Sequence, residues 1–148
     1  MRTVALTLAA VGMVAGCGAN ASQTVQRVLS TTALAVVEAD GMVAPMYEAA
    51  HDVALEASET LSEYEERMRP WTRVEMAFVS AKDSLVASQR SLDSYGEFHE
   101  GDIIGGLACL VGAVSAIAEG LRGLGVPIPD QLAQALGLLG PLASGECN

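Results

Sequence analysis

Apolar residues recur along much of this 148-residue chain in steps of three and four, a spacing that places them on one face of an α-helix. The first stripe consists of Val25, Leu29, Thr32, Val36, Ala39, Val43, Tyr47, Ala50, Ala54, Ala57, Leu61, Tyr64 and Met68. Gly41 and Pro45 interrupt it. Because proline removes a backbone donor and clashes one turn back, we predict a kink or short break at 40–45. Residues 23–68 are therefore expected to form either one long bent helix or two helices.

A second stripe follows Pro70 and predicts another amphipathic helix. It consists of Val74, Phe78, Ala81, Leu85, Ser88, Leu92 and Tyr95. Proline suits the first turn of a helix, so we predict that Pro70 ends one helix and begins the next. With almost no loop between them, the two helices should form an antiparallel hairpin of residues 43–68 and 71–95, with Trp71 filling its closed end.

The most apolar segment runs from Ile103 to Ala118 and contains 16 residues without a charge. It is shorter than the roughly 20 residues needed to cross a bilayer, so a helix buried within the protein is the better interpretation. A ridge of small residues along it would allow close approach of a neighbouring helix or of a second copy of the chain. This ridge comprises Ala108, Gly112, Ala116 and Gly120.

Glycines and prolines at 123–129 predict a turn, and a short last helix should begin near Asp130. Its apolar positions are Leu132, Leu136 and Leu139. The whole pattern predicts an all-α fold, a small antiparallel bundle of three to five helices with a long, kinked first helix. Residues 25–148 should form a single domain.

The first 17 residues have the pattern of a targeting signal and not of an amphipathic helix. Arg2 precedes an uncharged run over 4–14, too short to span a bilayer, which leads into Val14-Ala15-Gly16-Cys17. This segment resembles the signal of bacterial lipoproteins, an aliphatic residue and two small residues before a cysteine. The resemblance implies that residues 1–16 are cleaved and that Cys17 receives a diacylglycerol. Residues 17–24 would then be a lipidated cysteine and short tether. An ordinary secretory signal and an uncleaved anchor are the alternatives.

The same resemblance implies a location in the cell envelope. The residues directly after Cys17 are Gly18 and Ala19, not an acidic retention signal. The resemblance therefore points to the outer membrane facing the periplasm in a host with two membranes, and otherwise to the outer face of the plasma membrane. Export favours oxidised cysteines, so we predict a disulfide between Cys109 and Cys147. A buried free Cys109 is the alternative.

The net charge of the chain excludes some classes of binding partner. Without residues 1–16 the chain has 7 Lys and Arg against 18 Asp and Glu, a balance of −11 that argues against nucleic acid and anionic lipid. Six acids are expected to cluster on one helical face, opposite the apolar stripe from Tyr47 to Tyr64. They could contact a basic partner, bind divalent cations loosely, or form a solvated outer face. These acids are Glu48, Asp52, Glu56, Glu59, Glu63 and Glu66.

Motifs for catalysis are lacking in the sequence, which has no nucleophile elbow, phosphate-binding loop or closely spaced redox cysteines. The Glu48-x-x-His51 pair lacks the second such pair that a di-metal site requires, and His99 lies in a polar connection between helices. We therefore expect no enzyme activity, cofactor or metal.

The expected role is a membrane-anchored interaction or structural module that binds another envelope protein. One alternative is a carrier of a small apolar ligand within the bundle. Another is a lipoprotein of a mobile element that modifies the host surface.

Overall fold

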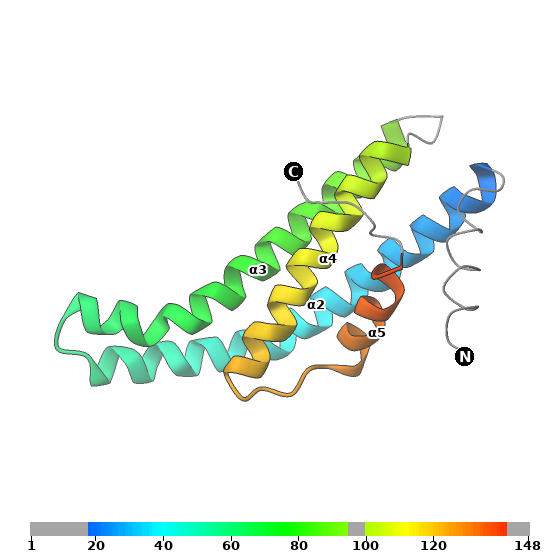
Figure 1. The fold of residues 1–148 in the computed structure, drawn as a ribbon. Coiled ribbons are helices and arrows are strands. Elements are labelled where there is room, and N and C mark those ends of the chain that lie inside the picture. Colours follow the sequence, from blue (N-terminus) through cyan, green and yellow to red (C-terminus); the bar gives the residue numbers. More distant parts are fainter. Residues whose placement is uncertain (1–17, 95–99, 142–148) are drawn as a thin grey trace, which may run out of the picture.

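A computed structural model describes residues 18–94 and 100–141, which form four helices and, within these ranges, no strand. The helices are α2 (Gly18–Ala57), α3 (Leu61–Ser94), α4 (Glu100–Gly123) and α5 (Asp130–Leu139). Figure 1 shows α2 and α3 as a long hairpin, α4 returning along α3, and α5 beside α2. The predicted all-α bundle is confirmed. The signal-like segment and Cys17 lie outside the described residues.

The turn of the hairpin is not at Pro70, as predicted, but at residues 58–60. Two hydrogen bonds explain its position. The Glu63 backbone N–H donates to Thr60 Oγ1 at 3.3 Å, and the Glu59 N–H donates to Glu63 Oε2 at 2.9 Å. This arrangement is close to a capping box, which satisfies backbone donors that the first turn of a helix leaves free. The hairpin therefore pairs 18–57 with 61–94, and the predicted pairing of 43–68 with 71–95 is wrong.

Both prolines of this region lie inside helices, Pro45 in α2 and Pro70 in α3. Pro70 has no N–H to donate to the Glu66 carbonyl one turn earlier. Both residues are exposed, so water can donate a hydrogen bond to that carbonyl instead. The chain passes through 40–45 without interruption as one 40-residue helix. The helix also includes residues 18–24, which were expected to be a tether.

The core follows the predicted stripes. In α2 and α3, the buried stripe residues are Val25, Leu29, Thr32, Val36, Ala39, Val43, Val74, Phe78, Ala81 and Ser88. The large apolar residues of α4 complete the core, namely Ile103, Leu107, Leu110, Val114, Ile117 and Leu121. By length and composition, Ser22–Ala57 and Gly105–Gly123 could each cross a membrane. A core helix passes the same test, and in α4 the large apolar side chains are the buried ones.

Close approach of α3 and α4 depends on two glycines of α4 that are 14 residues apart. A Cβ atom at Gly106 would lie 2.7 Å from Ser88 Oγ, and one at Gly120 would lie 2.5 Å from Val74 Cγ2. Gly106 and Gly120 are two heptads apart on α4, and the residues that they meet, Ser88 and Val74, are two heptads apart on α3. This spacing is expected for antiparallel helices in continuous contact. The predicted ridge is only partly correct, because Gly112 is exposed with no atom within 4 Å of its added Cβ.

The end of α4 agrees with the predicted turn. Gly125 has a φ of 72°, a left-handed conformation that glycine adopts without steric cost. The Val126 N–H donates to the Leu121 carbonyl at 2.9 Å, and the Gly125 N–H donates to that of Arg122 at 3.1 Å. These bonds form a Schellman motif that closes the helix. After the proline-containing turn, α5 begins at Asp130 and buries Leu132, Ala135 and Leu139.

Candidate functional site: an acidic arm and the cleft at its base

Beyond the end of α4, the hairpin of α2 and α3 continues as a two-helix projection (Figure 1). We call residues 47–71 the acidic arm. It holds seven acids and two arginines, a balance of −5. Among its residues only Ala54 and Met68 are buried, and neither belongs to the main core cluster. The acidic arm is thus stabilised by few contacts, a property typical of segments that bind partners or move.

Aromatic pairs hold the two helices of the acidic arm together. Tyr47 and Trp71 meet edge to face with ring centroids 6.5 Å apart and an interplanar angle of 84°. His51 and Tyr64 make a similar contact at 5.7 Å and 82°. Such geometry aligns the positive edge of one ring with the negative face of the other. The inner side of the acidic arm is therefore aromatic, while its outer side is charged.

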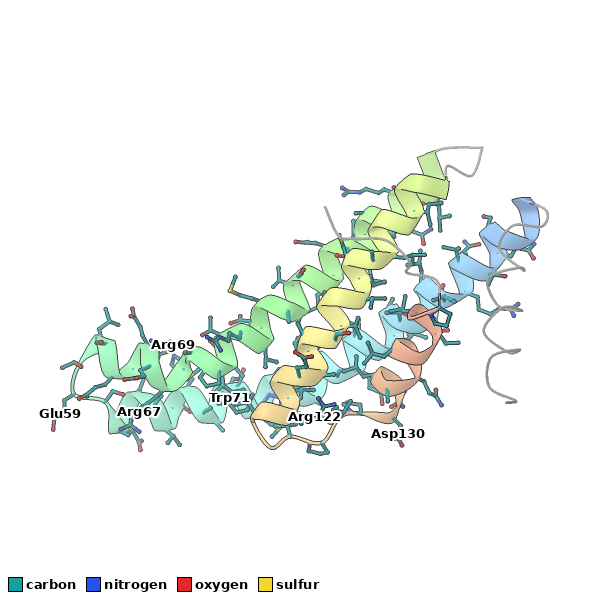
Figure 2. All side chains as sticks on the ribbon, viewed as in Figure 1. Glu59, Arg67, Arg69, Trp71, Arg122 and Asp130 are labelled. Atoms are coloured by element: carbon teal, nitrogen blue, oxygen red, sulfur yellow. The ribbon has the colours of Figure 1, made fainter. Side chains whose placement is uncertain are left out.

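The six acids expected on one helical face are divided between two helices. Three are on α2, Glu59 is in the turn, and two are on α3, because the first helix ends at Ala57. The predicted single stripe is therefore wrong. All six side chains are exposed, and Glu59 marks the tip of the acidic arm in Figure 2. The three acids on α2 are Glu48, Asp52 and Glu56, and the two on α3 are Glu63 and Glu66.

The roles of these acids differ. Glu63 caps α3 through its bond with the Glu59 N–H. Within the described part of the chain, no carboxylate of the acidic arm lies within 4.0 Å of a lysine or arginine nitrogen. Asp52 Oδ1 lies 3.6 Å from the neighbouring His51 Nδ1. Arg67 and Arg69 lie along α3 and not at a helix end. Most of the negative charge therefore faces solvent without a lysine or arginine contact from the described ranges.

A cleft of about 160 Å³ lies between α2 and α3 at the base of the acidic arm. The rings of Tyr47, Trp71 and Phe78 line it together with the acids Glu48 and Glu75. Trp71 is the only tryptophan of the chain, and its place beside the core is shown in Figure 2. The cleft therefore combines aromatic surface with negative charge, a pairing suited to cations.

The acids that line the cleft differ in whether a cation of the chain neutralises them. Asp40, which also lines it, accepts a hydrogen bond of 2.7 Å from Lys82 Nζ. No lysine or arginine nitrogen of the described residues lies within 4.0 Å of Glu48 or Glu75. Burial raises the pKa of Tyr47, and the charge of Glu75, the neighbouring Tyr64 and a hydrogen bond with Glu75 raise it further. The Tyr47 hydroxyl therefore stays protonated at neutral pH beside the Glu75 carboxylate.

Sequence reasoning missed this cleft because it placed the turn at Pro70. Once the turn is placed at 58–60, Tyr47 and Trp71 each lie twelve residues from Glu59. Residues equally distant from a tight antiparallel turn lie opposite each other, so the two rings should have been paired. The Thr60-x-x-Glu63 pattern was the signal that would have located the turn.

The remaining candidate residues are dispersed. Cys109 is a half-buried residue of α4 that lines an open groove with Met76 and Val79 of α3. Its predicted partner, Cys147, and the polar connection with His99 lie outside the described residues, so the disulfide stays a prediction. Among the residues that the structure does describe, no group of three or more His, Cys, Asp and Glu side chains could hold a metal ion.

Comparison of the chain with known protein families, curated proteins and solved structures finds no match.

Proposed function

We propose that this protein is a lipid-anchored component of the cell envelope that acts as a non-enzymatic interaction module. In this proposal the acidic arm docks on a basic surface of another envelope protein. The observation that carries it is the projection of residues 47–71 beyond the core, with exposed acids that contact no lysine or arginine of the described residues.

The spacing of the acids supports a role in binding. Glu48, Asp52 and Glu56 follow one another at four-residue intervals on α2. Like charges at this interval destabilise a helix by a few tenths of a kcal/mol per pair, and the described lysines and arginines do not offset this cost. A basic partner would offset it. Exposed charges are screened beyond about 8 Å at physiological ionic strength, so such docking should weaken in high salt.

The position of the acidic arm relative to the proposed anchor supports the same role. Cys17 directly precedes α2, and a helix of 40 residues is about 60 Å long. The acidic arm lies at the other end of that helix (Figure 1). A lipid on Cys17 would hold the protein at the membrane through two or more acyl chains, which is sufficient for stable anchoring. The acidic arm could then reach a partner far from the anchoring point.

Capture of partners from solubilised membranes would test the docking role. The test variant carries Glu48→Ser, Asp52→Ser and Glu56→Ser. The control variant carries Asp83→Ser, Asp93→Ser and Glu119→Ser, three exposed acids outside the acidic arm, and so changes the net charge equally. We expect the test variant to lose a partner that the wild type and the control variant retain. Equal recovery by all three proteins would remove the acidic arm from the proposal.

The anchor needs a separate experiment. In cells, Cys17→Ser should move the protein from the membrane fraction to the soluble fraction. If the variant remained with the membrane, lipidation of Cys17 would not be its anchor, and the two long apolar helices would have to be considered instead.

A further inference from the structure

The cleft at the base of the acidic arm carries a more specific inference. We propose that it receives one arginine side chain of the protein on which the acidic arm docks. The inference rests on the proposed docking function for the source of that side chain. Its own evidence is the cleft, whose walls are aromatic rings and whose carboxylates include two without a lysine or arginine partner in the described chain.

Size limits the occupant. Pockets for drug-sized ligands have volumes of about 300–1,000 Å³. The cleft, at about 160 Å³, is roughly half the lower limit and open to solvent. It can therefore take a single side chain presented from outside, but not a large cofactor.

Chemistry favours a guanidinium group. The rings of Tyr47 and Trp71 are held edge to face, so they present both a face and an edge within a small region. Arginine stacks on aromatic faces and donates paired hydrogen bonds to carboxylates. Glu48 and Glu75 supply the carboxylates, and the Tyr47 ring lies beside them in the lining of the cleft.

The chain itself shows how one carboxylate of this cleft is neutralised. Lys82 Nζ lies 2.7 Å from Asp40 Oδ2, so an internal cation already occupies that end. Glu48 and Glu75 have no such internal partner among the described residues. An external cation would therefore be directed to their side of the cleft, next to Trp71.

Trp71 provides a direct assay because it is the only tryptophan. Its fluorescence would be followed while the full chain is titrated with an alanine-based peptide carrying a single arginine. The reference peptide has citrulline, which keeps the shape and lacks the charge. The arginine peptide should shift the emission in a saturable manner, and the citrulline peptide should bind at least about tenfold more weakly.

Two matched variants separate the cleft from general attraction to an acidic protein. Glu75→Gln should raise the dissociation constant of the arginine peptide about tenfold, whereas Asp93→Asn, at the far end of α3 from the cleft, should change it less than about twofold. Both residues are exposed, so neither change threatens the fold. No saturable shift, equal binding of both peptides, or equal effects of the two variants would overturn the inference.

The two proposals can fail independently. If the titration fails while the membrane capture depends on the acids of the acidic arm, docking stands and the arginine pocket is wrong. If the titration succeeds and the capture does not depend on those acids, the cleft binds arginine and the docking role of the acidic arm is wrong.

Discussion

One methyl group, placed at either of two glycines of α4, tests the contact between α3 and α4. Gly112→Ala adds it on the exposed face, where no atom lies within 4 Å of the new Cβ. Gly120→Ala adds it 2.5 Å from Val74 Cγ2. Alanine is favoured over glycine within a helix by about 1 kcal/mol, and this gain applies to both variants. The difference in the free energy of unfolding between the two variants therefore measures the cost of the clash with Val74.

The expected difference follows from the distance. Carbon atoms prefer separations of about 3.5–4.0 Å, so the Gly120 variant requires a shift of about 1 Å. Val74 cannot supply it easily, because it is 1% exposed and valine is stiff about χ1 in a helix. Overpacking of this kind costs about 1–3 kcal/mol. We expect Gly112→Ala to raise the free energy of unfolding by about 1 kcal/mol, and Gly120→Ala to leave it unchanged or lower it by up to about 2 kcal/mol.

Urea denaturation followed by circular dichroism would measure both changes. A double-mutant cycle adds the decisive control, because Val74→Ala removes the methyl group that the new Cβ meets. In that background Gly120→Ala should become more favourable by about 1–2 kcal/mol. If Gly120→Ala and Gly112→Ala stabilised the protein equally, or if the cycle showed no coupling, the close approach of α3 and α4 would be refuted.

Four further predictions concern other parts of the fold. Ser88→Ala should raise the free energy of unfolding by about 1 kcal/mol, because Ser88 Oγ is buried without a hydrogen-bond partner; a lower value in urea denaturation would contradict this. Thr60→Ala should lower it by about 1 kcal/mol through loss of the cap, and an unchanged midpoint would show that the cap is unimportant. Burial raises the pKa of Tyr47, so the unfolded chain loses this proton first as pH rises through about 10. Above that pH, stability should fall more in the wild type than in Tyr47→Phe, and equal falls would exclude the effect. Mass spectrometry without reductant should find a peptide in which Cys109 is linked to Cys147, and two free thiols would contradict the disulfide.

Periodicity predicted the buried faces well. All six stripe residues from Val25 to Val43 are buried, as are Val74, Phe78 and Ala81. This success has a simple cause, because 3.6 residues per turn determine which side chains share a face, whatever the helix packs against. The same arithmetic placed all six acids on one face, which is wrong because the first helix ends at Ala57.

The position of the turn was predicted wrongly because two local signals compete. Pro70 costs a helix about 3 kcal/mol, which made it the stronger breaker by propensity. The cap formed by Thr60 and Glu63 contributes about 1 kcal/mol, yet the chain turns there. Turning at 58–60 pairs Tyr47 with Trp71 and lets α3 continue through Pro70 to its contact with α4 at Val74. Packing between helices outweighed the local penalty.

The sequence alone therefore determined the helical class, the buried faces, the excess of acid and the resemblance of Val14-Ala15-Gly16-Cys17 to a lipoprotein signal. Tertiary structure decided where the hairpin turns, that Gly106 and Gly120 meet α3 while Gly112 stays exposed, and that aromatic rings and acids from two helices share one cleft. The physical reason is that helical periodicity is a property of one segment. Contact between segments depends on the summed fit of many residues distant in the chain.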